Sequence, residues 1–262
     1  MNIKQKEFKS LCAEKNLDKI RDFIKTYQDE LTDIQSIMNE GFMISCYPGH
    51  LETIKYLLTS PEVKVKPDIH YEKDVALAIA CGYNYIEIVK YLLTSSDLKE
   101  HANLHADNNR AFVWACEFGH VEIIDYLLHS KDLKIHANMN DISETKQLAF
   151  LAACSEGKLD VLKYLKSQPQ LDIKLINKHI NGDGKNIFQL ACENMTKDTE
   201  IVEFLLIDYK YKPKKRDISY IQNNQDKELV SYAQDIINIM NTKNTLEKEL
   251  STKSEKVVRI KI

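Results

Sequence analysis

The chain has 262 residues, 36 basic and 39 acidic residues for a net charge of −3, and 44% hydrophobic residues, as in an ordinary soluble globular protein. The charge balance disfavours wholesale nucleic-acid binding, which needs a basic excess, and the longest apolar runs, of seven residues, are too short to span a membrane. Only 7 glycines and 5 prolines are present, and no apolar stretch follows the N-terminal charges, so the sequence predicts a mostly helical, cytoplasmic protein.

Residues 1–35 predict a pair of helices with a strongly polar outer face. Cys12 lies in the first of these helices, and it is the first of six cysteines spaced 34, 35, 35, 38 and 38 residues apart. A near-constant period indicates a repeat protein, in which a terminal repeat shields the core on one side only. We therefore predict that residues 1–35 form an N-terminal capping repeat.

Residues 36–210 predict about five further repeats of two helices each. A large apolar residue stands four positions before every cysteine, at Phe8, Phe42, Leu77, Phe112, Phe150 and Phe188. Later in each repeat, apolar residues follow helical spacing, and a residue that tolerates left-handed backbone lies between the two helices: Gly49, Asn84, Gly119 or Gly157. The sequence thus predicts an all-α solenoid with six reduced, buried cysteines, since each occupies an equivalent helical position.

Residues 211–262 predict a helical C-terminal cap or tail. A helix is expected over residues 217–250, with an apolar stripe at Leu229, Tyr232, Ile236, Ile237 and Met240. Before it, the run KPKKR at residues 212–216 resembles a short nuclear-localisation signal. A solvated loop between helices is the alternative that we favour, because short basic runs are common in a lysine-rich chain.

The repeats resemble the ankyrin repeat. The segment RAFVWACEFGHVEIIDYLL at residues 110–128 is similar to that family's T-P-L-H-x-A-A-x-x-G-H-x-E-I-V-x-x-L-L, and LETIKYLL and IEIVKYLL at residues 51–58 and 86–93 match its second half. The resemblance covers roughly residues 4–210. It implies stacked helix-turn-helix units with β-hairpin fingers, and binding of a partner protein on the concave face.

Two departures from that family affect the expected structure. The T-P-L-H start is missing, so we expect none of its side-chain hydrogen bonds; the last repeat has Asn186 and Gln189 at its Thr and His positions. The family's short link after the Leu-Leu pair is also replaced by the longer run TSSDLKEHANLH, while the next helix starts sooner. The simplest interpretation is a second helix longer by about one turn and a shortened β-hairpin finger.

A candidate contact site lies in the third and fourth repeats. Tyr83 and Phe118 share a column, two positions after the cysteine, that elsewhere holds Glu, Pro or Asn. In ankyrin-type stacks this column borders the concave surface, and exposed aromatic residues are enriched at interfaces. Asp74, Asn109 and Arg110, near the start of the same first helices, would supply polar contacts. The alternative is that the two rings cover the turns between helices.

The sequence contains no catalytic motif, and we expect no cofactor, no metal and no enzymatic activity. Six cysteines in equivalent columns argue for packing rather than for one activated thiol, and no metal-binding motif such as H-E-x-x-H or C-x-x-C is present. The leading hypothesis is a monomeric scaffold that binds a protein, not a nucleic acid or a membrane. Two alternatives stay open: a secreted bacterial or viral effector that targets a host protein in the cytosol or nucleus, and an enzyme with its activity in residues 211–262.

Overall fold

The computed structural model describes residues 3–14, 16–134, 136–137, 143–168, 184–194, 200–209 and 211–223, with scattered positions between 230 and 245. The chain forms two compact units, Met1–Ala152 and Ala153–Ile262. We describe each unit by itself.

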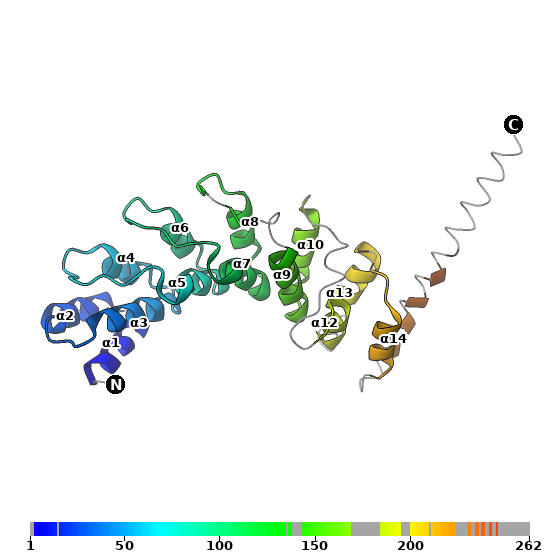
Figure 1. Ribbon diagram of the computed structural model, residues 1–262, viewed down its shortest axis with the longest axis horizontal. Coiled ribbons are helices and arrows are strands. Elements are labelled where there is room, and N and C mark those ends of the chain that lie inside the picture. The colour runs from blue at the N-terminus through cyan, green and yellow to red at the C-terminus, as the bar shows by residue number, and fades with distance from the viewer. Residues whose placement is uncertain are drawn as a thin grey trace, which may run out of the picture. The chain divides into compact units, whose positions relative to one another are not determined.

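The first unit consists of helix pairs stacked in chain order (Figure 1). Its pairs are α1 (Ile3–Ala13) with α2 (Leu17–Tyr27), α3 (Ile34–Cys46) with α4 (Leu51–Thr59), α5 (Tyr71–Gly82) with α6 (Ile86–Thr94), and α7 (Ala106–Phe118) with α8 (Val121–His129). The first helices contact one another in the order α1, α3, α5, α7. This arrangement confirms the predicted all-helical stack of two-helix repeats.

The turns inside the pairs have the predicted left-handed residues. Gly49, Asn84 and Gly119 have φ angles of 73°, 63° and 93°. Glycine adopts this conformation without a steric penalty and asparagine with a small one. Each first helix can therefore end abruptly and its partner can fold back against it.

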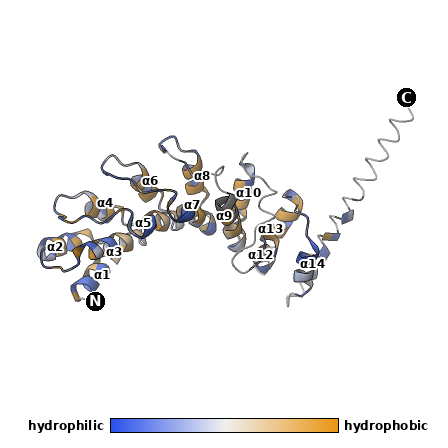
Figure 2. Ribbon diagram, viewed as in Figure 1, coloured by the Kyte–Doolittle hydropathy of each residue, from blue (hydrophilic) through white to orange (hydrophobic). Residues whose placement is uncertain are grey.

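The core is built from the repeated apolar columns. All six cysteines are buried and unpaired by disulfides, and Phe8, Phe42 and Phe112 are at most 1% exposed. Figure 2 shows α4, α6 and α8 as mainly hydrophobic helices, with more polar loops leaving them. In α5, small residues alternate with larger apolar ones. The small residues let the backbones of α5 and α7, which are in contact, approach each other closely.

The extra length after the second helices forms loops, so the predicted additional helical turn is wrong. The helix α6 ends at Thr94, and Ser95 is already extended, with ψ of 128°. The Ser95 hydroxyl accepts a hydrogen bond from the backbone N–H of Asp97, at 3.3 Å, and such local bonds compete with helix propagation. Ser60 and Ser130 end α4 and α8 in the same way. No β-strand occurs among the described residues, so the described fingers contain no hairpin ladder.

A repeated basic side chain closes each of these loops. His101 Nε2 lies 2.9 Å from the carbonyl oxygen of Ser95, and His136 Nε2 lies 2.7 Å from that of Ser130. In the repeat before these two, Lys66 plays the same part and donates to the carbonyl oxygen of Ser60. These contacts satisfy a carbonyl group beside the helix end, which has no intrahelical partner.

The second unit continues the helical pattern. The helix α9 (Ser143–Ser155) leads into it, and α10 (Leu159–Ser167), α12 (Ile187–Asn194), α13 (Glu200–Glu203), the π-helix η1 (Phe204–Asp208) and α14 (Lys215–Gln222) follow. Cys154, Phe188 and Cys192 are fully buried, as in the first unit. Of the apolar stripe predicted after residue 217, Ile237 is 5% exposed; the other four positions lie outside the described residues.

The last repeat forms hydrogen bonds that the sequence comparison did not lead us to expect. The Asn186 side chain accepts from the backbone N–H of Gln189 at 3.0 Å, and the Gln189 side chain accepts from that of Asn186 at 3.0 Å. This reciprocal pair is a capping box at the start of α12. Our expectation that no such bonds form is therefore wrong here, because the amide oxygens of Asn and Gln also accept hydrogen bonds from backbone N–H groups.

Candidate functional site

The exposed aromatic residues of the first unit gather at the turns between the first and second helices. Tyr47, Tyr83 and Phe118 are 42%, 50% and 46% exposed, and each lies within two residues of the end of α3, α5 or α7. Tyr85 and Trp114, both half-buried, lie beside them. We call these five residues the aromatic strip.

Ring contacts join the strip between the second and third repeats, and a separate ring pair lies in the fourth repeat. The Tyr83 ring meets that of Tyr47 edge-on at 5.7 Å between centroids, and it stacks on that of Tyr85 at 6.2 Å. Phe118 meets Trp114 edge-on at 6.4 Å. These separations are typical of favourable aromatic pairs, so contacts within the chain help to orient the rings.

Two glycines leave space for aromatic rings of the following repeat, because they have no side chain. A Cβ added at Gly49 would lie 2.7 Å from the Tyr85 ring, and one at Gly82 would lie 3.2 Å from Phe118 Cδ2. Phe118 therefore lies against the residue before Tyr83. The described ring pairs place Tyr83 with tyrosines and Phe118 with Trp114, rather than with each other.

Hydrogen bonds between repeats run alongside the rings. The Tyr85 hydroxyl donates to the carbonyl oxygen of Tyr47 at 3.0 Å, and His120 Nε2 lies 2.8 Å from that of Gly82. Both acceptors stand one position after the repeat cysteine. The carbonyl groups at the ends of α3 and α5 thus find partners in the next repeat, which orders the surface beneath the strip.

The polar residues of the predicted site are mostly internal. Asp74 is 6% exposed and Asn109 is 3% exposed. Asp74 Oδ1 accepts from the backbone N–H of Asn103 at 2.9 Å and lies 2.8 Å from His70 Nδ1. These two residues therefore fasten the loops, and their burial leaves little of either side chain for a partner.

The predicted site residue Arg110 is partly accessible. Its side chain is 32% exposed and forms an ion pair with Asp107, which Lys73 of the preceding repeat also contacts at 3.0 Å. Of the five predicted site residues, Tyr83 and Phe118 thus offer the most exposed surface, and Arg110 offers a smaller polar edge.

Sequence analysis did not single out Tyr47. Tyr47 stands one position after the cysteine, in a column that otherwise holds Ala13, Gly82, Glu117, Ser155 and Glu193. It is the only large apolar residue in that column, and this was the signal that could have revealed it.

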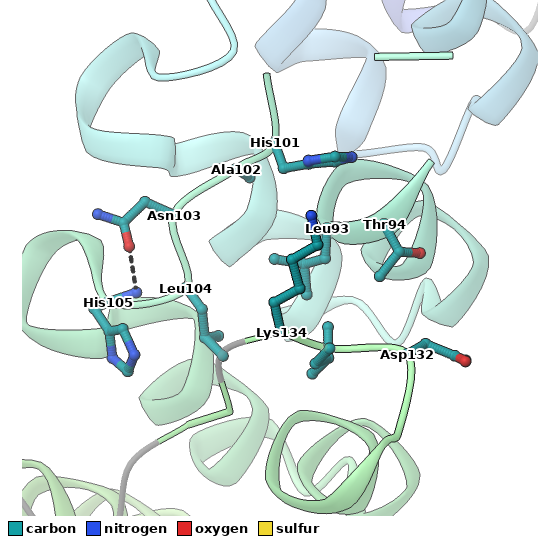
Figure 3. A pocket seen from close by; sticks show the side chains of 10 residues that line it. Leu93, Thr94, His101, Ala102, Asn103, Leu104, His105, Asp132 and Lys134 are labelled. Carbon is teal, nitrogen blue, oxygen red and sulfur yellow. Dashed lines mark hydrogen bonds between the residues drawn. The ribbon is translucent and has the colours of Figure 1, made fainter. Parts of the chain in front are cut away.

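A pocket of about 430 Å³ lies between the loops that follow α6 and α8 (Figure 3). Leu93, Ala102, Leu104 and Leu133 form its apolar lining, with polar groups from His101, Asn103, His105, Asp132 and Lys134. Several of these polar groups already bond within the chain: the Asn103 side chain accepts from the backbone N–H of His105 at 3.0 Å, and His105 Nδ1 lies 2.6 Å from Asn109 Oδ1. The pocket's polar edge therefore serves mainly to order the loop.

The buried thiols are not suited to nucleophilic chemistry. Burial raises the pKa of Cys12 and Cys192 to about 12 and raises the pKa of the other four thiols as well. Because the thiolate is the nucleophile, these cysteines are protonated and unreactive near neutral pH. No group of three or more His, Cys, Asp or Glu residues able to hold a metal ion occurs within the described ranges.

Comparison with known proteins identifies the repeats. A family model described as ankyrin repeats (3 copies) matches residues 42–141, which include the end of α3 and all of α4 to α8. A comparison with curated proteins finds no match, and no helix in the described part of the chain is long and apolar enough to cross a membrane. The period, the paired helices and this match agree, so residues 42–141 of this chain are ankyrin repeats.

Proposed function

We propose that this chain is a non-enzymatic scaffold that binds a partner protein on the concave face of its repeat stack, through the aromatic strip. The supporting observation is the exposure of Tyr47, Tyr83 and Phe118 in three consecutive repeats, each 42% to 50% exposed. Ankyrin repeats generally mediate protein–protein interaction, and aromatic residues are enriched in such contacts.

The strip has two physical properties of a contact surface. Its rings are held by ring contacts at 5.7 to 6.4 Å, so little side-chain entropy is lost on binding. Aromatic anchors of this kind dominate many interfaces. Arg110 would add a polar contact at the edge, while Asp74 and Asn109 act indirectly by fixing the adjoining loops.

The test is the double variant Tyr83→Ala/Phe118→Ala. Loss of two anchors costs about 2 kcal/mol or more of binding free energy, which is roughly a thirtyfold loss of affinity. Capture of partners from the native host lysate should therefore fall sharply, while the melting temperature should change little, since both rings are about half exposed.

A matched control removes an exposed apolar side chain elsewhere. Ile207 is 54% exposed in the second unit, and Ile207→Ala should leave capture unchanged. A double variant that melts normally and still captures the same partners would place the contact on another face. A double variant that melts several degrees earlier would show that the rings mainly support the fold.

A further inference from the structure

The pocket between the loops that follow α6 and α8 shares no residue with the aromatic strip. Its volume of about 430 Å³ lies within the range of small-molecule sites, about 300–1,000 Å³. Three of its apolar lining residues, Ala102, Leu104 and Leu133, are 8%, 4% and 7% exposed. The backbone N–H of Ala102 donates to the carbonyl oxygen of Leu92 at 2.9 Å, which ties the loop to α6. The apolar wall is therefore part of the packed core of the repeats.

Lys134 brings a positive charge to this pocket. Its side chain is exposed, and no hydrogen bond or ion pair joins its ammonium group to another residue in the described part of the chain. Figure 3 shows Lys134 extending across the pocket toward His101, whereas Asp132 points away from it. An anionic group in the pocket would therefore meet Lys134 without displacing an existing partner.

Two other polar groups of the lining are already engaged. The Thr94 hydroxyl donates to the carbonyl oxygen of Lys90 at 2.8 Å, and His101 Nε2 lies 2.9 Å from that of Ser95. Because a carbonyl oxygen only accepts, Nε2 carries the proton, and the neutral His101 ring leaves Nδ1 as an acceptor. One lysine beside an apolar wall suits a singly charged carboxylate better than a phosphate, which proteins bind with clusters of cationic donors.

We propose that this pocket binds a small molecule that has a compact apolar body and one carboxylate group. The apolar body contacts Leu93, Leu104 and Leu133, and the carboxylate pairs with Lys134. Burial of the apolar body supplies most of the affinity, since an ion pair with an exposed lysine adds little. This site is separate from the aromatic strip, so the proposal does not depend on the function proposed above.

The experiment is an NMR titration of the full chain, labelled at its leucine methyl groups. Octanoate, octanol and octylammonium are the probes, because they share one linear chain and differ in charge. We expect all binding to shift the signals of Leu104 and Leu133, with octanoate about threefold tighter than octanol and octylammonium weaker than both. Leu57, which is fully buried in α4, should not respond.

Variants of the chain locate the two parts of the site. Lys134→Met removes the charge and should weaken octanoate about threefold without affecting octanol. The matched control Lys131→Met removes an exposed lysine that belongs to the same loop but does not line the pocket, and it should change neither probe.

A third variant, Ala102→Leu, fills part of the apolar wall and should weaken octanoate and octanol about tenfold each. A larger residue is compatible with this loop, because Pro67 stands at the equivalent position after α4. Thermal melting of each variant verifies that it is folded.

Four outcomes would overturn the proposal. Equal affinity for the three probes would show that charge has no part in recognition, and equal weakening of octanoate by Lys131→Met would indicate only a general attraction of anions. Unchanged binding to a folded Ala102→Leu variant would place the probes elsewhere. Binding of an acetylated peptide that ends in leucine, without binding of octanoate, would assign the pocket to the C-terminus of a protein.

Discussion

At the scale of single residues, Asn186 joins two buried groups in the second unit. Its side chain caps α12 through the backbone N–H of Gln189 at 3.0 Å, and its Nδ2 donates to Asp217 Oδ1 at 2.6 Å. Asp217 is fully buried and also accepts from the Tyr211 hydroxyl and from the backbone N–H of Lys214. A buried carboxylate needs such donors, because leaving it unsatisfied is costly.

We predict that Asn186→Ala lowers the free energy of unfolding by about 2–3 kcal/mol. About 1 kcal/mol comes from the lost cap, and the remainder from the donor removed from a buried charge. Asn186→Thr keeps a capping oxygen and removes only the donor to Asp217, so its loss should be smaller. Urea unfolding measures both variants. An unchanged midpoint for Asn186→Ala would show that water replaces these bonds.

The structure of the basic run at residues 212–216 is explained in part by the hydrogen bonds of Asp217. Tyr211 is buried against Phe188, with stacked rings 5.2 Å apart, and Lys214 binds Asp217 through its backbone at the start of α14. The side chains of Lys212, Lys214, Lys215 and Arg216 remain exposed. The run therefore forms a solvated entry to a helix, as in the alternative that we favoured, and a localisation role stays a prediction.

At the scale of elements, two first helices begin with left-handed backbone. Glu72, Lys73 and Asp74 have φ angles of 47°, 58° and 60°, and Asp107, Asn108 and Asn109 repeat the feature. Left-handed backbone costs a non-glycine residue about 1–2 kcal/mol, less for Asn and Asp. The bonds of Asp74 and Asn109 to the adjoining histidines hold these segments in place.

We predict that Lys73→Gly is more stable than Lys73→Ala by about 1 kcal/mol. Both variants remove the exposed ion pair with Asp107, so their difference isolates the backbone. In an ordinary helix the order is reversed, with Ala favoured over Gly by about 1 kcal/mol. Thermal or urea unfolding of the two variants gives the sign, and greater stability of the alanine variant would argue against left-handed backbone at this position.

A second prediction at this scale concerns the contact between α1 and α3. A Cβ at Gly41 would lie 2.4 Å from Phe8 Cε1, and the Phe8 ring is fully buried. Gly41→Ala should therefore destabilise the protein by about 1–3 kcal/mol through overpacking, although alanine is the better helix former.

Gly82→Ala is the matched comparison for this prediction. Its nearest neighbour, Phe118 Cδ2 at 3.2 Å, is farther away and belongs to a half-exposed ring. The loss of unfolding free energy should therefore be smaller than for Gly41→Ala, and calorimetry can rank the two variants. The reverse order would contradict the rigid packing inferred between α1 and α3.

At the scale of the whole molecule, the six buried thiols make stability depend on alkaline pH. Burial raises the pKa of every cysteine above its ordinary value of 9.0, to about 12 for Cys12 and Cys192. Above pH 9 the unfolded chain loses thiol protons that the folded chain keeps. The thiols' contribution to stability is therefore complete below about pH 9 and declines as the pH rises toward 12.

We predict a loss of about 1.4 kcal/mol per pH unit for each buried thiol in this window. For six thiols, the loss of unfolding free energy over one pH unit is about 8 kcal/mol, which is comparable with the total stability of a typical domain. Urea unfolding at pH 8 to 10.5 measures the slope. Cys81→Ala/Cys116→Ala should reduce the thiol part of that slope by about one third, and an unchanged slope would show that other groups control alkaline unfolding.

The sequence by itself determined the repeat, its two helices and its core. The cysteine and phenylalanine columns recur because each repeat packs against an equivalent neighbour, and a buried column must stay apolar in every repeat. The turn residues Gly49, Asn84 and Gly119 were predictable for a similar reason, since few residues adopt left-handed backbone. Tyr83 and Phe118 were noticed because they interrupt a polar column, and both are exposed.

Only the tertiary structure determined the roles of the residues that depart from the repeat pattern. Whether the residues after Thr94 extend the helix or form a loop depends on the bonds of Ser95 and His101, which local sequence spacing does not specify. Asp74 and Asn109 appeared exposed because they are polar, yet they are buried, since Asp74 bonds the next repeat's loop and Asn109 bonds His105. Tyr47 joins the strip through a ring contact with Tyr83, 36 residues later in the chain. Periodicity fixes what all repeats share, whereas side chains that meet between repeats fix what makes each repeat different.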